Sequence, residues 1–102
     1  MIHVIATIRT AAGRRDDFLA AFRDLVPLVR AEAGCLEYGA AVDLDAQISG
    51  QPPVREDAVT VVEKWESVAA LRDHLAAPHM LAYRDKVKDL VTGVEIRVLE
   101  PV

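Results

Sequence analysis

The chain has 102 residues, of which 52% are hydrophobic, and its formal net charge is −4 at pH 7. This length fits one domain spanning residues 1–102, and the scattered basic residues form no patch that would bind nucleic acid. No apolar run approaches the roughly 18 residues that cross a membrane, and the apolar N-terminus lacks the positive region of a signal peptide. We therefore expect a cytoplasmic protein with no membrane insertion.

The first third of the chain predicts a strand, a helix and a second strand. Apolar side chains at positions 2, 4, 6 and 8 predict a strand over residues 2–9. Apolar side chains at 18, 22, 25 and 29 predict a helix from about 14 to 32. Pro27 should kink or break its last turns, and Gly34 should end it. Residues 35–43 predict a strand in which Leu36, Tyr38 and Val42 share a face.

The remaining elements follow a long loop over residues 44–56. Alternation over 57–66 predicts a third strand, and Ser67 is a suitable N-cap for a helix from 68 to about 76. Pro78 interrupts that helix, and a further helical piece is expected from about 79 to 90. Gly93 ends this piece, and residues 94–100 predict a fourth strand. Cys35 is the only cysteine, so it forms no internal disulfide, and no CxxC or HExxH spacing suggests a metal.

The element order β-α-β-β-α-β is typical of an α+β, ferredoxin-like fold with two helices on one face of a four-stranded antiparallel sheet. The opposite face would then be uncovered. That face is nevertheless predicted to be largely apolar or small, with Ile5, Cys35, Val62 and Leu99 among its members. We therefore expect a homodimer in which the sheet of a second copy packs there.

A small group of residues in the second half is the candidate site. Glu63 and Trp65 share an apolar strand face, where a carboxylate needs a partner or an opening. His74 lies at the edge of the next helix's apolar stripe, from which it could reach a space between helix and sheet. Tyr38 is a further wall of such a cavity. The residues alone equally allow His74 to be a hydrogen-bonded structural residue and Trp65 to be core.

Several segments resemble one protein family. These are the first strand Val4–Thr10, the corner Glu32–Cys35, the run Glu63–Ser67 with His74 and Pro78–Met80, and the closing Ile96–Pro101. Their order and spacing are similar to those of the cofactor-independent quinol monooxygenases of the antibiotic biosynthesis monooxygenase family. The resemblance covers nearly the whole chain apart from the 44–56 loop.

The resemblance implies a dimeric α+β barrel with one pocket per subunit between sheet and helices. It also implies oxidation of a quinol or phenolic substrate by O₂ without metal, flavin or haem. His74 is then the candidate general base, because an imidazole titrates near neutral pH. Trp65 and Tyr38 would be aromatic walls, and Glu63 would orient His74 or a substrate hydroxyl. His79 and Tyr83 are further candidates for substrate binding.

Two other functions remain open on the sequence. The same fold serves an isomerase of a small phosphorylated metabolite, which would favour a concentrated basic pocket that the sequence does not display. A non-enzymatic dimeric ligand-binding module is the other alternative, and a cavity filled by side chains would favour it.

Overall fold

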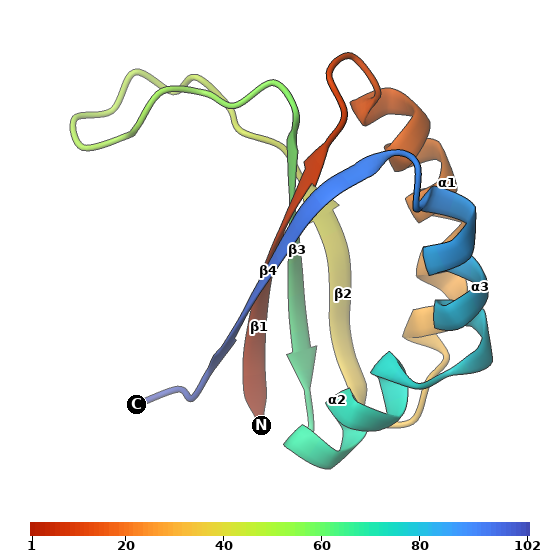
Figure 1. Cartoon of the computed structure of the whole chain (residues 1–102). Helices are drawn as coiled ribbons and strands as arrows, with labels where there is room; N and C mark the ends of the chain where they lie inside the picture. Colours follow the sequence, from red (N-terminus) through yellow and green to blue (C-terminus); the bar gives the residue numbers. More distant parts are fainter.

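The computed structural model describes residues 1–102 and has seven regular elements. In chain order they are β1 (Ile2–Thr10), α1 (Arg15–Arg30), β2 (Cys35–Ala41), β3 (Ala58–Trp65), α2 (Val68–Leu75), α3 (Pro78–Val87) and β4 (Val91–Leu99). The strands form one antiparallel sheet in the order β2-β3-β1-β4. All three helices lie on one side of it (Figure 1). The predicted α+β, ferredoxin-like fold is confirmed, with its second helical part divided into α2 and α3.

The core lies between the sheet and the helices because both present apolar side chains at their natural periods. On β1 the even positions from Val4 to Thr10 are buried. On α1, Phe18 and Phe22 are fully or almost fully buried, and their rings stack with centroids 6.1 Å apart. The period-2 pattern of the strands and the helical stripe of α1 therefore specify the same layer.

The helix boundaries follow local chemistry, with one departure from expectation. Ser67 is the N-cap of α2, and its hydroxyl accepts a hydrogen bond from the Ala70 backbone N–H at 3.1 Å. Pro78 occupies the first turn of α3, where its missing N–H has no helical partner to lose. Pro27, however, does not break α1, which continues to Arg30. The proline removes one backbone hydrogen bond, and burial of Val29 holds the following turn against the core.

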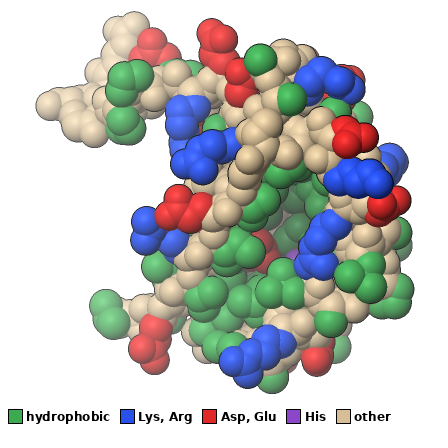
Figure 2. All heavy atoms as spheres, in the orientation of Figure 1, with side chains coloured by type: hydrophobic (Ala, Val, Ile, Leu, Met, Phe, Trp, Pro, Cys, Tyr) green, Lys and Arg blue, Asp and Glu red, His purple; other side chains and the backbone are tan.

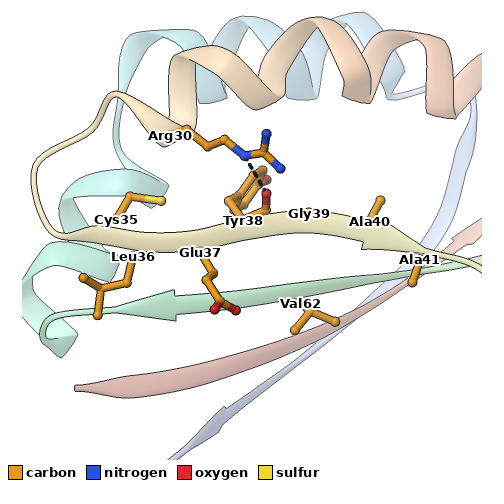
Figure 3. A pocket seen from close by; sticks show the side chains of 9 residues that line it. All are labelled: Arg30, Cys35, Leu36, Glu37, Tyr38, Gly39, Ala40, Ala41 and Val62. Carbon is orange, nitrogen blue, oxygen red and sulfur yellow. Dashed lines mark hydrogen bonds between the residues drawn. The ribbon is translucent and has the colours of Figure 1, made fainter.

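A bulge in β2 corrects the predicted faces of this strand. Cys35 pairs with Trp65 and Glu37 with Lys64, so Leu36 is an extra residue without a partner on β3. Figure 3 shows the result: Leu36 and Glu37 point away from the helices, whereas Cys35 and Tyr38 point toward them. The predictions that Leu36 shares a face with Tyr38, and that Cys35 lies on the opposite face, were therefore wrong.

The last strand begins earlier than predicted, at Val91 rather than at 94. Val91 pairs with Thr10 across a register shift that follows Arg9, so the sheet continues through Gly93. The segment between β2 and β3 forms no helix or strand and projects on the side of the sheet opposite the helices (Figure 1). None of the three helices has the length and apolar character that spanning a bilayer requires.

Candidate active site

A cavity of about 320 Å³ lies between the helix layer and the sheet. Its walls are mainly apolar side chains from β1, α1, α3 and β4, such as Phe22, Met80 and Ile96. Figure 2 shows this hollow, with apolar walls, acidic and histidine side chains at its floor, and basic side chains on its rim. Glu63 and His74 are its only acidic and histidine lining residues. The space therefore suits a flat apolar molecule that carries a few polar atoms.

His74 is the most strongly constrained of the polar groups. It projects from α2, its side chain is 2% exposed, and its Nδ1 lies 2.8 Å from the Oε2 atom of Glu32. When Nδ1–H donates to that carboxylate, Nε2 is left as an unprotonated acceptor. Nε2 forms no hydrogen bond within the chain. Burial lowers the pKa of His74 despite the opposing effect of Glu32, which favours the neutral imidazole.

Glu32 joins three elements through a single oxygen atom. It follows α1, and its Oε2 also accepts from Nε2 of His79, the second residue of α3, at 2.8 Å. His79 is 26% exposed and is not part of the cavity lining. The carboxylate thus fixes the positions of α2 and α3 relative to the corner between α1 and β2. No three His, Cys, Asp or Glu side chains have an arrangement that would hold a metal ion.

Aromatic rings enclose the His74 imidazole. The Trp65 ring lies 4.6 Å from it, centroid to centroid, and the Tyr38 ring lies 5.5 Å from it at an interplanar angle of 66°. Tyr38 lines the cavity and also stacks on Phe22. Trp65 is completely buried and does not line the cavity. It therefore supports His74 and the floor from behind.

Glu63 is a buried carboxylate with no cationic partner. Its side chain comes from β3, only 6% of the residue is exposed, and its Oε1 accepts a hydrogen bond from the Trp65 indole N–H at 2.9 Å. Burial is the main reason that its pKa rises to about 7, with a smaller contribution from the negative charge of Glu32 and opposition from the Trp65 hydrogen bond. Glu63 can therefore gain or lose a proton near neutral pH.

Tyr83 supplies an unpaired hydroxyl. It lines the cavity from α3, and its Oη atom is buried without a hydrogen-bond partner. Burial raises the pKa of Tyr83, so the phenol stays protonated and able to donate. A ligand oxygen in the cavity would satisfy this donor. Arg84 on α3 and Lys88 at the C-cap of that helix are the basic lining residues.

The structure brings together four of the six residues singled out from the sequence. Tyr38, Glu63, His74 and Tyr83 line one cavity, whereas Trp65 lies behind it and His79 outside it. Sequence analysis did not identify Glu32. This residue orients His74 through a hydrogen bond, a role that the sequence analysis assigned to Glu63. Its position at the helix-to-strand corner was visible only as part of the family resemblance, because 42 residues separate it from His74.

The chain is similar to known proteins over nearly its whole length. The family model described as "Antibiotic biosynthesis monooxygenase" matches residues 1–86. The Escherichia coli protein "Probable quinol monooxygenase YgiN" is 43% identical over 99% of this chain and 98% of its own length. Among solved structures, PA3566 from Pseudomonas aeruginosa has a TM-score of 0.82 at 30% identity, over 99% of this chain and 93% of that one.

Rv0793 from Mycobacterium tuberculosis is a further structural neighbour, with a TM-score of 0.80 at 28% identity, covering 99% of this chain and 94% of its own. The matches therefore extend over the whole fold, including β4, which lies beyond the residues that the family model covers. This chain belongs to the antibiotic biosynthesis monooxygenase family and is an enzyme of the monooxygenase class.

Proposed function

We propose that the protein oxidises a quinol or a related phenolic aromatic with O₂, using His74 as the general base and no cofactor. One observation carries the proposal: a neutral, buried imidazole, held through Nδ1 by Glu32, lines an otherwise largely apolar cavity. The similarity to a protein described as a quinol monooxygenase supports the choice of substrate class.

The proposed reaction begins with proton transfer from a substrate hydroxyl to Nε2 of His74. The resulting phenolate gives an electron to O₂ much more readily than the neutral phenol does, and the radical pair then combines at a ring carbon. In the overall balance a quinol and O₂ give a hydroxylated quinone and water. The chain's part is to take the proton, exclude water and hold the ring, for which Tyr38 and Phe22 provide flat walls.

The Tyr83 hydroxyl fits the same scheme as a donor. Because its Oη atom is buried and unpaired, a substrate oxygen in the cavity would gain a hydrogen bond there at no cost to an existing one. That bond would stabilise negative charge on the oxygen as the proton leaves for His74.

The test is O₂ uptake by purified, metal-free protein with a panel of hydroquinones. His74→Ala should lower turnover by about 10²–10⁴-fold, the usual effect of removing a general base. Lys86→Ala is the control, because Lys86 is 61% exposed on α3, pairs with Asp24 and does not line the cavity. Near-normal turnover in folded His74→Ala would contradict the proposal. Hydroquinone binding without O₂ uptake by the wild type would favour a binding module.

We also propose that the protein is a homodimer joined through the sheet face opposite the helices. Leu36, Val62 and Leu99 on that face are 49%, 40% and 44% exposed, which is unusual for apolar side chains gathered on one sheet. Sedimentation at micromolar concentration should give a dimer, and Val62→Lys should shift it toward monomer. Leu81→Lys, at a 57% exposed position on α3, should not. A stable wild-type monomer would contradict this proposal.

A further inference from the structure

Two proton acceptors lie at the floor of the cavity and come from different elements of the fold. His74 comes from the helix layer on α2, and Glu63 comes from the sheet on β3. Each is tied to its own partner outside the cavity: His74 to Glu32 at 2.8 Å and Glu63 to the Trp65 indole at 2.9 Å. The Trp65 bond occupies one carboxylate oxygen, so the other is free to accept. A reaction that uses only His74 leaves this second group unexplained.

The surroundings of Glu63 make it an unusual place for a carboxylate. The opposite residue on β1 is Val4, and on β2 it is Tyr38. Several titratable or charged groups line the cavity with Glu63 or interact with its charge. They are Tyr38 and Cys35 of β2, His74 of α2, Tyr83 and Arg84 of α3, Lys88 at the C-cap of α3, and Glu32. None of them forms an ion pair with it. Burial of a carboxylate without such a partner lowers the stability of the fold. Its presence in the cavity lining therefore points to a function at the site.

Quinol chemistry supplies a use for it. A quinol has two hydroxyls, and its conversion to a quinone removes both protons. His74 can take only one, because its Nδ1 is already protonated and bound to Glu32. Water would be the usual second acceptor, but an apolar cavity supplies little of it. The second proton therefore needs an acceptor built into the wall.

We propose that Glu63 is a second catalytic base, which takes the proton of the other quinol hydroxyl and so makes the site selective for substrates with two ionisable oxygens. The inference rests on the proposed quinol oxidation. One O–H bond breaks toward Nε2 of His74 and the other toward a carboxylate oxygen of Glu63. O₂ receives the electrons that the substrate loses, and its O–O bond breaks. One oxygen atom forms the new ring C–O bond in place of a ring C–H bond, and the proton of that C–H bond stays on the new hydroxyl. The two protons leave with the other oxygen as water, which restores both bases.

The protonation behaviour of the two groups is compatible with this role. Burial brings the pKa of Glu63 to about 7 and lowers the pKa of His74. Both groups are therefore largely unprotonated on the alkaline side of neutrality, where both can accept. At acid pH both groups carry a proton, so neither can accept one from the substrate. The loss of both bases should make kcat/KM fall more steeply with pH than the loss of one base would.

The experiment is the pH dependence of kcat/KM for hydroquinone, a probe whose hydroxyls ionise only near about pH 10. In the wild type, log kcat/KM should rise with a slope of 2 at the acid end and a slope of 1 between the two pKa values. Glu63→Gln and His74→Gln should each leave a single limb of slope 1. Glu63→Gln should also lower kcat/KM by about 10²–10⁴-fold. Gln can still accept the Trp65 hydrogen bond, so the floor keeps its shape.

Asp24→Asn is the matched control, because Asp24 is a carboxylate on α1 that is 80% exposed, pairs with Lys86 and does not line the cavity. It should leave both limbs unchanged. Trp65→Phe is a second variant in case Glu63→Gln folds poorly. Loss of the indole donor removes a stabiliser of the Glu63 anion, so the upper limb should move to higher pH.

The outcomes separate the two proposals. A wild-type limb of slope 1 that only His74→Gln abolishes would overturn the role of Glu63 and keep the quinol oxidation. An unchanged upper limb in both Glu63→Gln and Trp65→Phe would overturn it as well. Profiles that neither the His74 nor the Glu63 variant alters would overturn the proposed function itself.

Discussion

Replacement of Gly34 by alanine tests how tightly the corner before β2 is packed against α2. Gly34 has a φ of +83°, and a Cβ added there would lie 2.6 Å from the Cβ of Ala70. Real Cβ atoms do not approach so closely, and the Ala70 methyl cannot rotate away. The backbone of α2, which carries His74, would have to move. The substitution therefore combines a strained backbone with a steric clash.

Gly13 separates these two effects. Its φ is +73°, but nothing lies within 4 Å of the position that a Cβ would take. Gly13→Ala should cost about 1–2 kcal/mol, the usual penalty of the left-handed conformation for a residue with a side chain. Gly34→Ala should add the cost of overpacking, about 1–3 kcal/mol, for a total of about 2–5 kcal/mol. The difference between the two variants in free energy of unfolding therefore measures the cost of the steric clash.

The assay is urea unfolding at one protein concentration, because dimerisation would make the apparent stability depend on concentration. Thermal unfolding is a second measurement, in which a loss of 1 kcal/mol should lower the Tm by about 4–8 °C in a chain of this size. Adding Ala70→Gly should recover part of the loss in Gly34→Ala, since it removes the clashing methyl. If Gly34→Ala costs no more than Gly13→Ala, the close contact between the corner and α2 is refuted.

Two further predictions concern the carboxylates of Glu32 and Glu63. Glu32→Gln should lower turnover about tenfold or more. It should also move the limb of the pH profile that belongs to His74 to lower pH, because the negative charge that favours the imidazolium is lost. A limb at the same pH as in the wild type would contradict this prediction. Burial raises the pKa of Glu63 from 4.5 to about 7, so the folded state holds a proton that the unfolded state has lost in this range. Stability should therefore fall by up to about 3 kcal/mol as pH rises through that window, and chemical denaturation of Glu63→Gln should show no such fall.

The sequence predicted best where a local period determines which side chains are buried. The alternation in β1 and β3 correctly placed Val4, Ile8 and Glu63 on the core side, because strand side chains alternate unless the register slips. It failed for Leu36 because a bulge adds one residue to β2, and nothing in the local pattern marks that extra residue. The start of β4 was missed for a related reason, because it depends on pairing with β1 across the register shift after Arg9.

The site was predictable only in part. Four residues found from the sequence line one cavity, since each lies on a core-facing side of its own element. The hydrogen bonds among the buried groups were not predictable. His74 forms its hydrogen bond with Glu32 rather than with Glu63, and the Trp65 indole N–H donates to Glu63 instead. These choices depend on how α1, α2 and α3 dock on the sheet, and such tertiary placement leaves no periodic signal in the sequence.

The bulge in β2 also affects how the protein behaves in concentrated solution. β2 is an edge of the sheet, and a regular edge presents unpaired backbone groups to which a strand of another molecule can add. In this protein the bulge at Leu36 interrupts the row of unpaired backbone groups along β2. The Tyr38 carbonyl already accepts a hydrogen bond from Nε of Arg30 at 3.1 Å (Figure 3). An incoming strand would meet a kinked and partly occupied backbone. The arrangement thus opposes growth of the sheet into fibrous aggregates.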